Sequence, residues 1–173
     1  MDLKLLIRNI PDHPKPGINF KDITPLFLNP DAVQQACADM TAPFIGDSID
    51  FVIGIESRGF LFGVQVAYNL KAGFIPIRKP GKLPGDTIKA DYSLEYGTDS
   101  LEMHTGQFKQ GANILIVDDL LATGGTVSAA AELVKREGGN LIGFSFLIEL
   151  SFLNGRGKLE EKKVTSLISY DEE

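Results

Sequence analysis

The sequence predicts an α/β protein with a mostly parallel central sheet flanked by helices. Two observations support this. Four short apolar segments have the continuous hydrophobic character of strands buried on both faces, at 51–55, 74–77, 114–117 and 141–150. Helical patterns follow two of these segments, at 59–71 and 126–136. Strands that alternate with helices favour parallel pairing, because a crossover helix returns the chain to the same end of the sheet.

The remaining elements are predicted in chain order. Residues 3–10 have the pattern of a short amphipathic helix, which a run of prolines then ends. Residues 31–45 are expected to be helical, with Asp31 as N-terminal cap and Pro43 as a late irregularity. Residues 79–100 are rich in glycine, proline, charge and tyrosine. This segment is too long for an ordinary connection, so we expect a hairpin, a mobile lid or both.

Composition excludes several classes of protein. The 173 residues suit one α/β domain spanning 1–173, and a hydrophobic content of 43% can fill its core. A formal charge of -6 argues against a nucleic-acid or membrane-surface partner. The single Cys37 is expected to be a buried small side chain. The sequence shows no signal peptide, and its apolar runs are shorter than the ~18 residues of a membrane span, so we expect a cytoplasmic protein.

A candidate sugar-phosphate site lies in residues 114–126, ILIVDDLLATGGT. An apolar strand delivers Asp118 and Asp119 to its carboxyl end, where ligands bind in open parallel sheets. The Gly124-Gly125 turn then leads into a helix, whose N-terminal N–H groups can cradle a phosphate. Acids beside a phosphate are favourable if they accept hydrogen bonds from sugar hydroxyls. The absence of a Lys after these glycines excludes the Walker phosphate loop.

This stretch resembles the phosphoribosyl pyrophosphate motif of type I phosphoribosyltransferases. The resemblance implies that Asp118 and Asp119 bind the ribose 2′ and 3′ hydroxyls. It also implies that five consecutive residues wrap the 5′-phosphate, namely Ala122, Thr123, Gly124, Gly125 and Thr126. The same family implies a type I phosphoribosyltransferase-like fold with a short N-terminal base-binding hood at about 1–30 and a flexible catalytic lid at about 87–98.

Four further stretches resemble the adenine-specific branch of this family, at 16–25, 56–60, 77–85 and 92–97. They run in family order with the central motif, so the chain is similar to adenine phosphoribosyltransferases from about residue 10 onward. Such enzymes transfer 5-phosphoribosyl from phosphoribosyl pyrophosphate to adenine in purine salvage. The products are AMP and pyrophosphate.

The resemblance assigns further site residues. Those expected at adenine are Asn19, Phe20, Lys21 and Leu150, with Lys21 standing where the family usually has Arg. Those expected at pyrophosphate are Ser57, Arg58, Arg78 and Lys82. The residues implied in catalysis are Glu95, Tyr96 and Arg58, with Glu95 as general acid or base near purine N7. The peptide after Glu56 is expected to be cis, as is typical of the family.

The resemblance also implies a cofactor and a partner. Mg²⁺ is expected as cofactor, held mainly by substrate oxygens and water and not by protein ligands. Similar enzymes are homodimers in which the residue matching Arg78 reaches the partner's site. We expect no nucleic acid and no membrane among the partners.

Two other functions remain open at this stage. A non-catalytic sensor of phosphoribosyl pyrophosphate would carry a DNA-binding segment or a basic face, and neither is evident. An enzyme for 6-oxopurines would usually have an acid at the position of Ala122, to engage N7. An orotate enzyme belongs to this second alternative, and a product assay over a panel of bases separates all of them.

Overall fold

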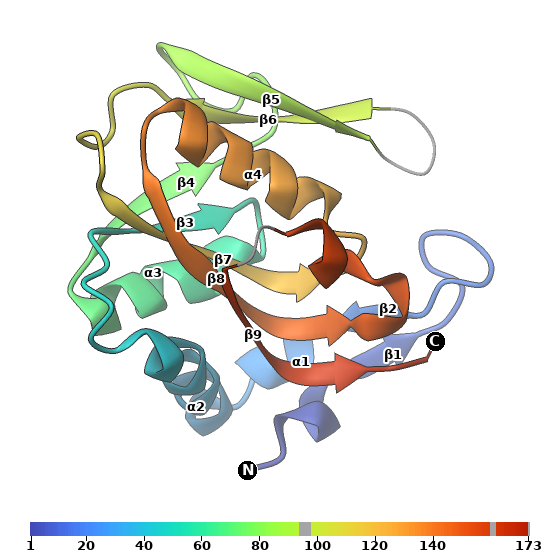
Figure 1. Ribbon diagram of the computed structural model, residues 1–173. Coiled ribbons are helices and arrows are strands. Elements are labelled where there is room, and N and C mark those ends of the chain that lie inside the picture. The colour runs from blue at the N-terminus through green and yellow to red at the C-terminus, as the bar shows by residue number, and fades with distance from the viewer. Residues whose placement is uncertain (94–97, 160–161, 173) are drawn as a thin grey trace.

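A five-stranded parallel sheet forms the centre of the computed structural model, which describes residues 1–93, 98–159 and 162–172 (Figure 1). The strand order is β4-β3-β7-β8-β9. The bounds are β3 (Phe51–Ile55), β4 (Gly73–Ile77), β7 (Asn113–Leu121), β8 (Asn140–Leu150) and β9 (Lys163–Tyr170). Every neighbouring pair in this sheet is parallel. The predicted fold class is therefore confirmed.

Helices cover both faces of the sheet (Figure 1). One face carries α1 (Thr24–Phe27), α2 (Pro30–Thr41) and α3 (Gly59–Leu70), and the other carries α4 (Gly125–Arg136). The alternation of side chains along β7 divides the core between these faces. Leu115 and Val117 pack with the α2 and α3 side, whereas Ile114 and Ile116 pack with the α4 side. None of the helices in the described part of the chain could span a lipid bilayer.

Two antiparallel hairpins extend from this core. The first pairs β1 (Arg8–Ile10) with β2 (Phe20–Asp22), and the second pairs β5 (Thr87–Ser93) with β6 (Thr98–His104). Figure 1 shows the second hairpin lying over α4. The hairpin expected between 79 and 100 is therefore confirmed. Of the lid expected at about 87–98, residues 87–93 and 98 belong to this hairpin, and residues 94–97 lie outside the described residues.

Two predictions for the N-terminal third were wrong. Residues 3–10 form the short 3-10 helix η1 (Leu3–Leu6) and then β1, because pairing with β2 draws this segment into an extended conformation. The cap of α2 is Asn29 and not Asp31, since the Asn29 side chain accepts hydrogen bonds from two backbone N–H groups of the first turn.

Three further 3-10 helices complete the elements. α2 ends at Thr41, four residues earlier than predicted, and the irregularity at Pro43 is the 3-10 helix η2 (Ala42–Phe44). After β8 the chain forms η3 (Ser151–Leu153) and η4 (Gly155–Lys158) before entering β9. These two turns lie at the carboxyl end of the sheet, beside the candidate site.

Candidate active site

A cavity of about 470 Å³ opens at the carboxyl ends of β3 and β7, where the α/β fold predicts a ligand site. Its lining combines the acid pair, the glycine turn and the residues after β3. The lining residues are Phe20, Ile55, Glu56, Ser57, Arg58, Lys79, Tyr92, Asp118, Asp119, Leu120, Ala122, Thr123, Gly124, Gly125, Thr126 and Val127. Segments far apart in the sequence therefore meet as predicted.

The acid pair is buried at the end of β7. Asp118 and Asp119 are only 8% and 5% exposed, and the backbone N–H of Asp119 donates to Asp118 Oδ1 at 2.9 Å. Burial raises the pKa of Asp118, and the neighbouring Asp119 charge raises it further. Burial also raises the pKa of Asp119, although Arg58 opposes that rise. Two carboxylates thus remain in a place that disfavours their charge, which is typical of a ligand-binding site.

Arg58 joins three parts of the site. Its Nη2 lies 2.9 Å from Asp119 Oδ2, and its guanidinium lies 4.9 Å from the centre of the Phe20 ring. Arg58 directly precedes α3, and the Glu56–Ser57 peptide before it is cis, as expected. The next residue is Gly59, where a Cβ would come within 2.6 Å of Asp118 Oδ1. Glycine there lets the start of α3 lie directly against the acid pair.

The glycine turn after β7 presents an uncapped helix N-terminus to the cavity. Gly124 has φ of 80°, a conformation that favours glycine, and α4 begins at the next residue. No side chain caps this end of α4. Its first backbone N–H groups, together with the positive end of the helix dipole, are suited to an anion. The structure thus places an uncapped helix N-terminus next to the buried acids.

Several predicted residues lie outside this cavity. Arg78 Nε pairs with Glu56 Oε2 of the same chain at 2.8 Å, and Lys82 is exposed. Leu150 packs against the core instead of lining the cavity. Glu95 and Tyr96 lie outside the described residues.

The strand alternation of β2 separates the predicted adenine residues. Phe20 faces Arg58, whereas Asn19 and Lys21 line a second cavity of about 360 Å³ beside Tyr170. Lys21 Nζ donates to Asn9 Oδ1 at 2.9 Å and lies 4.2 Å from the centre of the Tyr170 ring. The difference between Lys and the usual Arg at this position therefore falls on the far side of β2 from Phe20.

Sequence reasoning missed Lys79 and Tyr92 as lining residues. Lys79 Nζ contacts Asp99 Oδ2 at 2.6 Å, which raises the pKa of the lysine, and Tyr92 donates to the same carboxylate oxygen at 3.2 Å. The signal for Tyr92 was the alternation of Ile88, Ala90 and Tyr92 along β5, which predicts one inward face.

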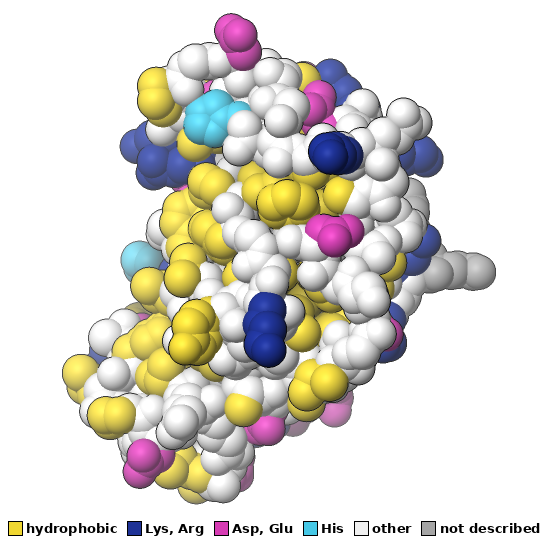
Figure 2. Space-filling model, turned by 90° about the vertical axis from the view of Figure 1, so that its left-hand side faces the viewer, with side chains coloured by type: hydrophobic (Ala, Val, Ile, Leu, Met, Phe, Trp, Pro, Cys, Tyr) yellow, Lys and Arg dark blue, Asp and Glu magenta, His cyan; other side chains and the backbone are white. Residues whose placement is uncertain are grey.

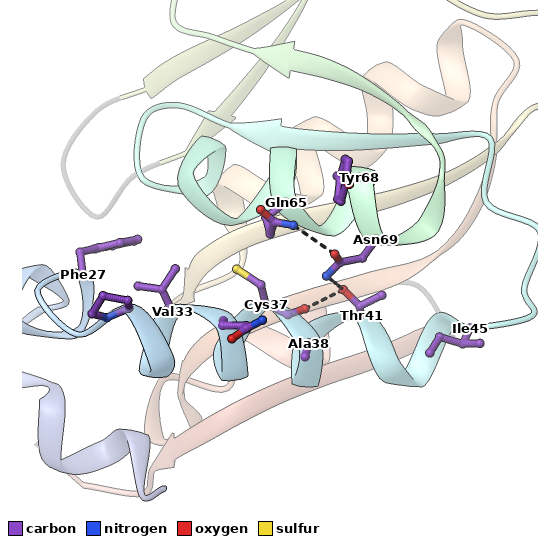
Figure 3. Close-up of a pocket in the computed structure, with 11 residues that line it drawn as sticks. Phe27, Val33, Cys37, Ala38, Thr41, Ile45, Gln65, Tyr68 and Asn69 are labelled. Atoms are coloured by element: carbon purple, nitrogen blue, oxygen red, sulfur yellow. Dashed lines mark hydrogen bonds between the residues drawn. The ribbon is translucent and has the colours of Figure 1, made fainter.

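Another, larger cavity is chemically unsuited to a phosphorylated substrate. It has a volume of about 820 Å³ and lies between α2 and α3, as Figure 3 shows. Its polar side chains bond one another, with Gln65 donating to Asn69 and Asn69 donating to Thr41. Its lining residues include no Asp, Glu, Lys, Arg or His. Charge and hydrogen-bonding groups, and not size, therefore identify the active site.

The fold and the site together define a class of protein, the phosphoribosyltransferases. The family described as "Phosphoribosyl transferase domain" matches residues 28–172. The sequence is 54% identical over 169 residues to adenine phosphoribosyltransferase of Koribacter versatilis, covering 98% of this chain and 93% of the relative. It is likewise 54% identical over 171 residues to that of Clostridium perfringens, covering 99% of both. The chain belongs to the adenine phosphoribosyltransferase family.

Solved structures agree with this assignment. The adenine phosphoribosyltransferase of Thermoanaerobacter pseudethanolicus superposes with a TM-score of 0.95 at 48% identity, over 98% of both chains. The enzyme of Saccharomyces cerevisiae superposes with a TM-score of 0.90 at 44% identity, over 96% of both chains. That yeast structure contains an imino-altritol bisphosphate together with adenine. The resemblance found in the sequence motifs is therefore confirmed over nearly the full chain.

Proposed function

We propose that the cavity at the ends of β3 and β7 is where this chain carries out the reaction of its family. That reaction transfers 5-phosphoribosyl from phosphoribosyl pyrophosphate to adenine and releases AMP and pyrophosphate. The observation that carries the site assignment is the unsatisfied carboxylate oxygen Oδ2 of Asp119. It is buried without a hydrogen bond of good geometry, although Arg58 lies close by. A ribose hydroxyl would satisfy it, because buried acceptors are normally hydrogen-bonded.

The division of labour follows from charge. The cradle of residues 122–126 binds the 5′-phosphate through the N-terminus of α4, and Asp118 and Asp119 accept from the ribose hydroxyls. Arg58 and Ser57 line the same cavity, where they would bind the pyrophosphate. As the anomeric C–O bond breaks, the sugar develops oxocarbenium character and the leaving group gains negative charge. The Arg58 guanidinium stabilises that charge.

The base belongs beside Phe20. The Phe20 ring lines the cavity and supplies a face on which a purine can stack. Ala122 has no titratable group, so proton transfer at N7 falls to Glu95, with Tyr96 closing the site from the lid. We propose that residues 1–30, which contain the β1–β2 hairpin, form the hood over this base within one domain. Asn19 and Lys21 would contribute through their backbone groups, because their side chains face Tyr170.

Mg²⁺ fits a site of this kind as a substrate-bound ion. Among the described residues no group of three His, Cys, Asp or Glu side chains could hold a metal. The buried Asp118 and Asp119 offer hard oxygen atoms at the ribose position, which suits an ion carried in with the substrate. When bound, the ion would neutralise charge on the pyrophosphate.

We further propose that the chain acts as a homodimer. Leu61, Val64 and Tyr68 follow one another at helical spacing along α3 and are 54%, 54% and 78% exposed. Hydrophobic side chains gather on the face that Figure 2 presents, the side of Figure 1 on which α2 and α3 lie. An exposed apolar stripe of this kind marks a protein contact. In the dimer Arg78 and Lys82 would reach the pyrophosphate of the partner's site.

The test is a product assay with phosphoribosyl pyrophosphate, Mg²⁺ and a panel of bases. Adenine offers a 6-amino donor, whereas hypoxanthine and guanine offer a 6-oxo acceptor. A site built to bond the amino group should prefer adenine in kcat/KM by ~10⁴-fold. Hypoxanthine or guanine turned over as efficiently as adenine would contradict the base assignment while leaving the phosphoribosyl transfer intact.

A further inference from the structure

An ion pair with a buried carboxylate lies beside the glycine turn and has no part in the reaction described so far. Glu149, near the end of β8, is 6% exposed, and Arg156 in η4 grips both of its carboxylate oxygens. Arg156 Nε donates to Oε1 at 3.0 Å, and Nη2 contacts Oε2. Ser166 on β9 donates to Oε2 at 2.6 Å. The hydrogen bonds that Glu149 accepts from Arg156 hold the pKa of its carboxyl group below the usual range.

This pair fixes η4 to β8 and β9, the last two strands at one edge of the sheet. Arg156 Nη1 also donates to the backbone oxygen of Val164 on β9, at 2.8 Å. The guanidinium is therefore bonded to β8 through Glu149 and to β9 through Val164. The planar fork of an arginine is needed for this, because its separate nitrogens reach both carboxylate oxygens and the Val164 oxygen, whereas the donors of a lysine all diverge from a single nitrogen. The position of η4 thus depends on one side chain.

The backbone of η4 presses directly on the cradle. Gly155, which precedes Arg156, is buried, and a Cβ added to it would lie 2.0 Å from the carbonyl oxygen of Ala122. Conversely, a Cβ on Gly124 would lie 2.5 Å from the carbonyl oxygen of Gly155. The two backbones are therefore in contact with no room for a side chain between them. On the other side of η4, Ser128 Oγ of α4 donates to the Lys158 oxygen at 3.4 Å.

We propose that Arg156 is a positioning residue for the 5′-phosphate: with Glu149 it holds Gly155 against residues 122–124 and so keeps the cradle N–H groups aimed at the ligand. The inference rests on the proposed assignment of the 5′-phosphate to this turn. Hydrogen bonds to phosphate depend steeply on direction, so a cradle without its backing should bind phosphate more weakly. Arg58, whose contacts are with Asp119 and Phe20 and not with η4, should be unaffected.

The first experiment compares ligands with and without the 5′-phosphate by calorimetry. Arg156→Ala should weaken AMP and ribose 5-phosphate by about 10-fold or more, the equivalent of one good phosphate hydrogen bond. Adenosine and pyrophosphate should bind as they do to the unaltered chain. Lys163→Ala is the matched control. Lys163 lies on β9 next to Val164 and pairs with Asp47. Its side chain is as exposed as that of Arg156 (43% against 45%) and carries the same charge. It should leave all four affinities unchanged.

Two further variants separate geometry from charge and from folding. Arg156→Lys keeps the charge but loses the fork, so it should remain impaired toward AMP. Gly155→Ala keeps the ion pair but forces η4 off the cradle, because its Cβ would clash with the Ala122 carbonyl. Its φ is not positive, so only the lack of space is tested. Gly155→Ala should reproduce the loss of AMP affinity. If Arg156→Ala does not fold, Arg156→Lys and Gly155→Ala test the proposal in its place.

The inference is overturned if Arg156→Ala and Gly155→Ala bind AMP normally, or if they lose adenosine and pyrophosphate by the same factor as AMP. Full affinity in Arg156→Lys would also overturn it, because charge alone would then be sufficient. Thr126→Asp distinguishes these failures from a failure of the proposed site. A carboxylate at the start of α4 should exclude the phosphate, and unchanged AMP affinity in that variant would refute the cradle itself.

Discussion

At the scale of single residues, the candidate site contains two carboxylates whose burial disfavours their negative charge. Asp118 is buried, its nearest charged neighbour is Asp119, and its pKa is raised by both. Asp119 at least has Arg58 at 2.9 Å. Keeping both carboxylates ionised therefore lowers the stability of the ligand-free protein. Binding sites commonly trade stability for function in this way.

Asp118→Asn should stabilise the free protein and weaken ribose binding. The amide keeps an oxygen that can accept the Asp119 N–H, while the buried charge is removed. We expect a gain of roughly 1 kcal/mol, or about 2–4 °C in Tm at pH 7. Phosphoribosyl pyrophosphate should bind more weakly, because a charge-assisted hydrogen bond is lost. Calorimetric scanning and titration measure the two effects.

The same prediction has a definite pH dependence. Because the folded-state pKa of Asp118 is raised, its protonated form favours folding, and this stability is lost as pH rises through that pKa. The advantage of Asn should therefore vanish below the ordinary aspartate pKa and grow as pH rises from there toward the raised folded-state pKa. Asp119→Asn is the comparison, and it should stabilise less, because it also removes the Arg58 ion pair. Equal gains in both variants would contradict this reading of the pair.

At the scale of elements, one carboxylate links both strands of the N-terminal hairpin to the start of α1. Asp22, at the end of β2, accepts from Arg8 Nε on β1 at 2.9 Å. It also accepts from the hydroxyl and the backbone N–H of Thr24 at 2.6 and 2.9 Å, at the start of α1. The contacts with Thr24, followed by Arg8, lower the pKa of Asp22 from 3.8 to about 2. The hood thus rests on an ionised side chain.

Acid should loosen this hairpin in a defined pH window. Because the folded pKa is depressed, the contribution of Asp22 is full above its unfolded pKa of about 4 and is lost as pH falls toward about 2. The protection of the β1 and β2 amides against hydrogen exchange, relative to the intrinsic rate at each pH, should fall across that window. Asp22→Asn should show faster exchange already at pH 7 and little further change in acid. If the Asp22→Asn variant still lost protection between about pH 4 and about 2, the acid response would come from other carboxylates and this prediction would be wrong.

At the scale of the whole molecule, α3 carries an exposed apolar stripe on its outer face. The stripe of Leu61, Val64 and Tyr68 lies on α3, whose other face packs into the core through Phe62 and Val66. Since α3 begins at the active site, a second subunit on this stripe would brace the segment that carries Arg58. Assembly and catalysis would then be coupled through one helix.

Val64→Glu should therefore dissociate the dimer and lower activity together. A buried carboxylate without a partner is strongly unfavourable, so the affinity between subunits should fall by several orders of magnitude. Sedimentation should give twice the 18.8 kDa chain mass for the unaltered protein and the single mass for the variant. Leu5→Glu is the control, since Leu5 is 82% exposed in η1, away from α3. A Val64→Glu dimer, or a monomeric unaltered protein, would contradict the proposed surface.

How far the sequence predicted the fold depended on how each strand is buried. β3, β7 and β8 are inside the sheet and read as continuous apolar runs. β9 lies at the sheet edge with mostly half-buried residues, KVTSLISY, and has no such run to detect.

Within the site, Asp118 through Thr126 are contiguous and were found from one motif. Arg156 was missed because its link to Glu149 joins a loop to a strand, and no local period records that contact.

The buried Cys37 has a practical consequence. It is 1% exposed, and burial raises its pKa to about 11, so hardly any nucleophilic thiolate is present at neutral pH. The only thiol in the sequence should therefore not react with maleimides while the protein is folded. A second cysteine placed at the exposed Thr98, where β6 begins, could be labelled selectively without deleting the first. A fluorophore or spin label attached there would report on the neighbouring 94–97 segment during turnover, in an otherwise unaltered enzyme.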